Sequence, residues 1–201
     1  MLDARLRRLI DPPLDRLSAP LTARGVSANA VTVTGFAIGL GAAAAIAAQA
    51  YLFGLVLLLL NRLFDGLDGA IARRRGLSDL GGFLDIVLDF LVYSAVPFAF
   101  ALAHPTANAL PAAFLIFSFI GTGSSFLAYA IMAAKRGIST ELRGRKSLYY
   151  LGGLTEGTET ILAFVLACLW PAWFPPIAWV FGGLCWLTTA TRIAVAVQTL
   201  R

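Results

Sequence analysis

Four aspartates lie close together in a chain that is otherwise strongly apolar. They are Asp65, Asp68, Asp85 and Asp89. The first two are three residues apart and the last two are four apart, so each pair lies on one face of a helix. Each ionised carboxylate costs roughly 3 kcal/mol or more at the depth of a lipid bilayer, so a cluster of four needs compensating cations. Hard divalent cations prefer oxygen ligands, and two of them about 4 Å apart can hold a phosphoryl group. The cluster therefore predicts a metal site for phosphate chemistry.

The segment between the two pairs predicts how they meet. Residues 73–79 are polar and interrupt two apolar stretches, which is typical of a turn. If two antiparallel helices turn near Leu77, Asp68 stands level with Asp85, roughly 12 Å from the turn at 1.5 Å per residue. The outer pair, Asp65 and Asp89, stands level at roughly 18 Å.

Three other interpretations of the cluster are open from the residues alone. The carboxylates are neutralised by Arg62 and by Arg73, Arg74 and Arg75, or they bind a cation in a cation-coupled transporter. A transporter of this kind is expected to carry inverted repeats or broken helices, and the sequence shows neither. A prenyltransferase with aspartate-rich motifs leaves Gly69, Ala72 and Gly81 unexplained.

The composition predicts an all-α integral membrane protein. Apolar residues make up 59% of the 201 residues, charged residues only 13%, and the mean hydropathy is +0.80. Six stretches are long enough to span a bilayer: residues 29–50, 51–73, 80–103, 109–134, 148–170 and 175–199. We therefore expect a single membrane domain over residues 1–201. It consists of an interfacial segment over 1–28 and a six-transmembrane-helix bundle over 29–201.

The positive charges predict the orientation of this bundle. Five arginines precede the first span, three lie between the second and third, and five Lys or Arg lie at positions 135–146. The other turns carry no Lys or Arg. By the positive-inside rule both termini and the aspartate hairpin face the cytoplasm, in the cytoplasmic (inner) membrane. The net charge of +5 then provides a surface for anionic lipid headgroups, and no nucleic-acid partner is expected.

The first residues predict an amphipathic helix in the membrane interface. Leu2, Leu6 and Leu9 recur at helical spacing with arginines between them. We expect Pro12 and Pro13 to break this helix, and a second short helix to follow. The segment either anchors the chain or shapes the entrance for lipid.

A second polar cluster lies in the fifth predicted span. Glu156 and Glu159 share a helix face, and Arg192 in the last span lies at a comparable depth. They form either a Glu–Arg lock within the bundle or the wall of an acceptor pocket suited to an amino alcohol or a polyol. Lys135 and Arg143 border the cytoplasmic mouth, where they suit a phosphorylated alcohol or serve only as positive-inside residues.

Two further polar residues open the first span. Asn29 and Thr32 lie one helical turn apart at its cytoplasmic edge, where they either contribute to helix packing or donate hydrogen bonds to a ligand. The glycines and alanines that follow are typical of close helix packing in lipid.

The aspartate segment as a whole resembles a long family motif. It reads D-x2-D-G-x2-A-R from Asp65 to Arg73, then G-x3-D-x3-D from Gly81 to Asp89. This is similar to the motif of the CDP-alcohol phosphotransferase family, except that seven residues rather than eight separate Arg73 from Gly81. The resemblance extends over the chain, since the family is a six-helix membrane bundle with the motif on its second and third helices.

The resemblance implies a reaction and its residues. Such enzymes move a phosphatidyl or similar group from a CDP-linked lipid donor, CDP-diacylglycerol first among them, to an alcohol acceptor, releasing CMP. It implies two cofactor ions, Mg²⁺ or Mn²⁺, held by the four aspartates, with Asp89 as general base, and it implies a homodimer. Residues 27–32 are similar to the family's P-N-x-x-T segment, with Ala28 in place of proline. The residues expected to contact the donor are Asn29, Thr32, Gly69, Ala72, Arg73, Ser78 and Gly81.

Overall fold

The computed structural model describes residues 3–137 and 154–200, with side chains from residue 10 onward, and the regular elements of this part are helices. The elements are α1 (Asp3–Ala23), α2 (Ala28–Ala47), α3 (Tyr51–Arg75), α4 (Asp79–Ala103), α5 (Pro105–Lys135), α6 (Gly157–Leu169), the 3₁₀ turn η1 (Pro171–Trp173) and α7 (Phe174–Thr199). The expected all-α class is confirmed.

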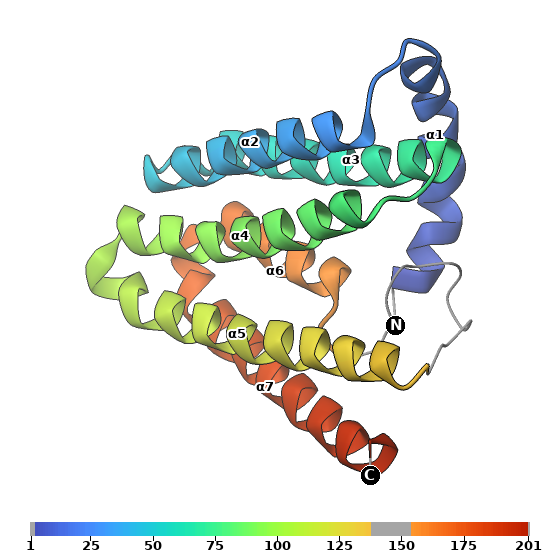
Figure 1. Ribbon diagram of the computed structural model, residues 1–201. Coiled ribbons are helices and arrows are strands. Elements are labelled where there is room, and N and C mark those ends of the chain that lie inside the picture. Colours follow the sequence, from blue (N-terminus) through green and yellow to red (C-terminus); the bar gives the residue numbers. More distant parts are fainter. Residues whose placement is uncertain (1–2, 138–153, 201) are drawn as a thin grey trace.

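In the part of the chain that the structure describes, helices α2 to α7 form the bundle, and α1 crosses one end of it (Figure 1). Helix α2 packs against both α3 and α4, while α5 packs against α4 and α7. The α3–α4 turn lies at the α1 end together with the last residues of α5 and α7, and the α2–α3, α4–α5 and α6–α7 connections lie at the opposite end (Figure 1). Arg73, Arg74, Arg75, Lys135 and Arg136 therefore share one end, as the positive-inside pattern predicts.

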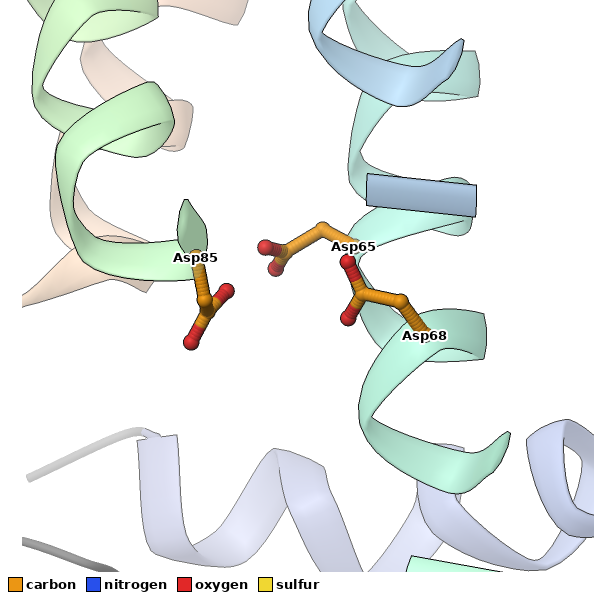
Figure 2. A group of neighbouring side chains, drawn as sticks. All are labelled: Asp65, Asp68 and Asp85. Atoms are coloured by element: carbon orange, nitrogen blue, oxygen red, sulfur yellow. The ribbon is translucent and has the colours of Figure 1, made fainter. Parts of the chain in front are cut away.

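Small residues bring the first three bundle helices together. A Cβ on Gly35 would lie 2.9 Å from the Cβ of Phe64 in α3, and a Cβ on Gly39 would lie 2.7 Å from Val92 Cγ2 in α4. Only glycine allows α2 to approach both helices this closely. Helices α3 and α4 run in opposite directions, and the aspartates lie between them (Figures 1 and 2).

Among the described residues, four helices are long and apolar enough to cross a membrane: α2, α4, α5 and the stretch Pro171–Thr199 that contains η1 and α7. Helix α3 is as long as α4, with 25 residues each. Its apolar character is interrupted by Asn61, Arg62, Asp65 and Asp68. Four of the six predicted spans are thus supported by length and composition.

The prediction of a helical span over residues 148–170 is wrong in its described part. Helix α6 begins at Gly157 and has 13 residues, and Leu154–Glu156 precede it without helical structure. Glu156 is its N-cap, and its side chain and that of Glu159 each accept a backbone N–H in a capping box. Such reciprocal capping satisfies the free donors of a first turn, so these glutamates mark a helix start rather than a helix interior.

The expected break at Pro12 and Pro13 is also wrong, because α1 is continuous from Asp3 to Ala23. The two prolines remove backbone donors, but packing holds the helix together. Leu14 and Ser18 are buried, and Leu14 Cδ1 lies against Gly66 of α3. Tertiary contacts therefore outweigh the local preference of the prolines.

Candidate metal centre

Three of the four aspartates converge between α3 and α4. One carboxylate oxygen from each of Asp65, Asp68 and Asp85 lies within 4.8 Å of the others. Figure 2 shows the side chains of Asp65 and Asp68 from α3 pointing toward that of Asp85 on α4. Like charges at this separation repel each other, and a bound cation relieves the repulsion. The predicted meeting of the two aspartate pairs is confirmed for these three residues.

Within this trio, Asp68 has a buried carboxylate oxygen that a ligand could contact. Asp68 is only 5% exposed, and its Oδ2 atom has no hydrogen-bond partner among the described residues. A buried polar atom without a partner carries a desolvation cost of about 1–3 kcal/mol, and more when it is charged. An oxygen-preferring divalent cation satisfies such an atom, so the residues present fit the metal that the sequence predicts.

The fourth aspartate has a different environment. Arg62 donates from Nη2 to Asp89 Oδ1 (2.7 Å) and from Nη1 to Asp89 Oδ2 (3.2 Å), and the Tyr93 hydroxyl donates to Oδ2 (3.3 Å). Arg62 Nη1 also lies 3.7 Å from Asp65 Oδ2. Asp89 lines the same pocket as the trio but is held by a guanidinium.

The alternative in which arginines neutralise the cluster holds for Arg62 but not for the three at the end of α3. Arg73 Nη2 lies 3.8 Å from the Asp15 carboxylate, and Arg74 donates to the Asp15 carbonyl (2.9 Å). Arg75 donates to the carbonyls of Gly25 and Val26 (3.1 and 3.2 Å). These contacts therefore fasten α3 to α1 and to the α1–α2 loop.

The turn between α3 and α4 brings three predicted donor contacts together. Ser78 is the N-cap of α4, and its Oγ accepts the N–H of Gly81 (3.1 Å). A Cβ on Gly81 would lie 3.0 Å from Ser78 Oγ and 3.2 Å from Asn29 Oδ1. The first turns of α2 and α4 thus lie side by side, and the positive ends of two helix dipoles together favour an anion.

Thr32 and the small residues of α3 lie on the neighbouring surface. Thr32 lines the pocket of the aspartates, and its hydroxyl donates to Ala28 O (3.0 Å). Among the described residues, a Cβ on Gly69 would contact only Arg73 Nη1, at 3.4 Å, and Ala72 is half-buried on the next turn. Unlike Gly35 and Gly39, Gly69 is therefore not required by packing.

The predicted acceptor residues are spread over a wider region. Arg192 is 7% exposed, donates to Thr122 O (2.8 Å) and lies 5.6 Å above the Phe126 ring. Glu156 and Glu159 cap α6, Lys135 is exposed at the end of α5, and Arg143 lies outside the described residues. A Cβ on Gly157 would lie 3.4 Å from Tyr93 Oη, so the first turn of α6 adjoins the Asp89 network.

Sequence reasoning missed Asn61 and Tyr93 as members of the site. Both were detectable as polar residues of apolar helices at helical spacing from an aspartate, since Tyr93 follows Asp89 by four residues and Asn61 precedes Asp65 by four. Arg62 was expected only as a neutralising charge.

Comparisons with known proteins agree with this geometry. The sequence model of the family described as CDP-alcohol phosphatidyltransferase matches residues 25–195. The chain is 57% identical to inner membrane protein YnjF of Escherichia coli, strain K12, over 201 residues that cover this chain fully and 98% of the relative. It is 29% identical to the archaetidylinositol phosphate synthase of Pyrococcus horikoshii, over 98% of this chain and 97% of that one.

Solved structures show the same fold. The phosphatidylinositol phosphate synthase of Mycobacterium tuberculosis with CDP-DAG bound aligns with a TM-score of 0.66, at 20% identity, over 90% of this chain and 92% of that one. The same synthase with manganese and citrate aligns with a TM-score of 0.65. This chain belongs to the CDP-alcohol phosphatidyltransferase family and is a transferase of the EC 2.7.8 type. That class excludes the transporter and prenyltransferase interpretations.

Proposed function

We propose that this enzyme synthesises a phospholipid by moving a phosphatidyl group from CDP-diacylglycerol to an alcohol, with release of CMP. The observation that carries the proposal is the convergence of Asp65, Asp68 and Asp85 within 4.8 Å around a buried, unpartnered oxygen of Asp68. The bound CDP-DAG and the manganese of the structurally similar synthase support the same donor and metal here.

The proposed cofactors are two divalent cations, Mg²⁺ or Mn²⁺, which the four aspartates would hold. When bound, such ions neutralise the charge that develops on the pyrophosphate as it is cleaved. Asp65 and Asp68 supply oxygens from α3, and Asp85 and Asp89 supply them from α4. Because the carboxylates come from two helices that α2 fixes in place, the site is preorganised before the donor arrives.

The donor nucleotide is proposed to lie at the α3–α4 turn. The helix starts at Asn29 and at Ser78–Gly81 offer N–H groups to phosphate, and Arg73 adds a positive charge beside Gly69. Gly69 and Ala72 leave room for the nucleotide to lie against the backbone of α3, since no packing contact explains Gly69. Thr32 borders this surface and the aspartate pocket.

Asp89 is proposed as the general base of the transfer. Its carboxylate takes the proton of the acceptor hydroxyl, whose oxygen then bonds to the phosphorus that carries the diacylglycerol group. The bond from that phosphorus to the bridging oxygen breaks, and the electron pair leaves with CMP. Arg62 and Tyr93 orient Asp89 through three hydrogen bonds, which suits a base that must meet a hydroxyl at one position.

The proposed acceptor pocket contains Glu156, Glu159 and Arg192, with Lys135 and Arg143 at its mouth. A phosphorylated alcohol suits the three cations, and the names of two similar synthases include an inositol phosphate product. An amino alcohol or a polyol suits the two glutamates. We propose that the site faces the cytoplasm from the inner membrane, and that the enzyme is a homodimer. Gly121 and Gly123 in α5 pack against Thr189 and Phe90 of the same chain, so these small residues are already used within one protomer.

A mass-spectrometric acceptor screen tests the proposal. Purified enzyme with Mn²⁺ and CDP-diacylglycerol is offered inositol phosphate, glycerol phosphate, amino alcohols and polyols in separate reactions. We expect CMP and one new phospholipid to form in equal amounts with a single acceptor class, and neither to form with the Asp68→Asn variant. Absence of CMP release with every acceptor, by a folded enzyme loaded with Mn²⁺, would contradict it.

A further inference from the structure

The guanidinium of Arg62 is the most highly coordinated side-chain group in the described part of the site. Besides its two bonds to Asp89, it donates from Nε and Nη2 to Asn61 Oδ1 (2.9 and 2.6 Å) and from Nη1 to Tyr93 Oη (3.2 Å). Its carbon lies 5.4 Å above the Tyr93 ring, and its side chain is only 15% exposed. A planar fork held on every edge has little freedom to turn away.

Asn61 of α3 links the guanidinium to α2. Its side chain is buried, and its Nδ2 donates to the Gly35 carbonyl (2.8 Å). This bond leaves the Oδ1 atom of Asn61 directed at Arg62, where it accepts two N–H groups. Helices α2, α3 and α4 therefore contribute jointly to the position of one cation.

The consequence falls on Asp89. Both of its oxygens accept hydrogen bonds from Arg62, and one also accepts from Tyr93. The group of carboxylates close enough to share one ion contains Asp65, Asp68 and Asp85 and not Asp89. A first ion thus meets three carboxylates that lie within 4.8 Å of one another, whereas a second ion that uses Asp89 must share it with the guanidinium that donates to both of its oxygens.

We propose that Arg62 is a positioning residue that reserves Asp89, so that the two divalent cations bind in sequence, the second tightly only together with the anionic donor. This inference rests on the proposed two-cation transferase. Four carboxylates and one guanidinium leave three formal negative charges, and one divalent cation reduces these to one. A second cation makes the site positive, which is unfavourable in a half-buried pocket until the pyrophosphate of the donor supplies negative charge.

Manganese titration of the full-length enzyme in detergent tests this order. Bound Mn²⁺ is counted by electron paramagnetic resonance, with and without CDP, after subtraction of the Mn²⁺–CDP complex measured without protein. We expect the wild type to bind one ion tightly without CDP and a second at least tenfold more weakly. With CDP it should bind two, with the exchange-coupled spectrum of ions about 4 Å apart.

The Arg62→Gln variant should bind two ions without CDP, with the second at least tenfold tighter than in the wild type. Arg74→Gln is the matched control, since it removes one positive charge from the same helix at an exposed position and should titrate as the wild type does. Arg62→Lys keeps the charge but not the fork, and should give an intermediate affinity for the second ion.

Three results would overturn the inference. They are two ions of equal affinity in the wild type without CDP, an Arg62→Gln titration identical to that of the wild type, and an Arg74→Gln titration that matches Arg62→Gln. The first of these can be read from the wild type alone, so the test stands even where the Arg62 variants do not fold. Failure of the wild type to bind any Mn²⁺, with or without CDP, would instead contradict the proposed function.

Discussion

Arg62 and Asp89 form a two-point ion pair that joins α3 to α4, with contacts of 2.7 and 3.2 Å. Arg62 also donates to the Tyr93 hydroxyl, and this hydroxyl adjoins Gly157, the first residue of α6. The proposed base is therefore linked on one side to the carboxylate trio and on the other to the helix start that carries Glu156 and Glu159. This relationship places Asp89 between the proposed metal and acceptor regions.

The Asp89→Asn substitution should separate chemistry from donor binding. Asparagine keeps the shape and one neutral oxygen but removes the basicity, so the transfer rate should fall by about 10²–10⁴. Binding of CDP with Mn²⁺, measured by calorimetry, should stay within about tenfold of the wild type, or about 1.4 kcal/mol. If nucleotide binding collapses together with the rate, Asp89 is chiefly a metal ligand and Glu156 becomes the next candidate for the base.

Substitution in the trio should have the opposite pattern. Asp65→Asn or Asp68→Asn removes an anionic ligand from the proposed two-cation site, so both Mn²⁺ binding and turnover should be lost. Each variant should still fold in detergent, because the substitution relieves repulsion among like charges. Size-exclusion profiles check the fold and CMP release checks the activity. More than a tenth of wild-type activity in both variants argues against two-metal catalysis.

Two substitutions distinguish a glycine that leaves space for a ligand from a glycine that allows close helix packing. Gly69→Ala meets only the flexible end of Arg73, so helix stability should rise by about 0.5–1 kcal/mol while CDP binding weakens at least tenfold. Gly39→Ala places a Cβ 2.7 Å from Val92 Cγ2 and should cost about 1–3 kcal/mol by overpacking. Thermal unfolding and CDP titration of both variants give the comparison. Unchanged CDP affinity in a stabilised Gly69→Ala enzyme would contradict the proposal that the nucleotide lies against Gly69.

Glu159 has an observed structural role and a proposed acceptor role, and two substitutions separate them. Glu159→Gln retains an oxygen that accepts the Glu156 N–H, so the melting temperature should hold while KM for the acceptor rises. Glu159→Ala removes the cap as well and should cost about 1 kcal/mol of stability. Steady-state kinetics and thermal unfolding are the measurements. A Gln variant with unchanged acceptor KM leaves Glu159 with the capping role alone.

Much of the fold could be predicted because lipid leaves few choices. The apolar stretches, the turn between Arg73 and Asp79, and the separation of basic from neutral connections all follow from length and charge, and the structure agrees with them. The start of α6 could not be found in this way. An apolar run does not reveal whether a Thr-Glu-Gly-Thr-Glu segment lies within a helix or caps it, since the capping box depends on the backbone before Gly157.

The site was predictable in its residue types but not in its pairings. The aspartate spacing predicts that the carboxylates of α3 and those of α4 face each other, and three of the four meet as expected. It does not predict that Arg62 rather than Arg73 reaches them, because that depends on how α2 and Asn61 orient the side chain. The same holds for α1, where burial of Leu14 against Gly66 overcomes the effect of two prolines.

Thermal unfolding with Mn²⁺ and CDP is the most direct test of the central claim that the aspartate trio binds metal to hold a cytidine diphosphate donor. Each of the two should be added alone and then both together, to the wild type and to Asp68→Asn. At a ligand concentration of 100 times Kd, binding stabilises the folded state by about 2.7 kcal/mol. We predict that CDP raises the melting temperature of the wild type only when Mn²⁺ is present, and that Asp68→Asn shows no rise. A full shift with Mn²⁺ alone, to which CDP adds nothing, would contradict the claim.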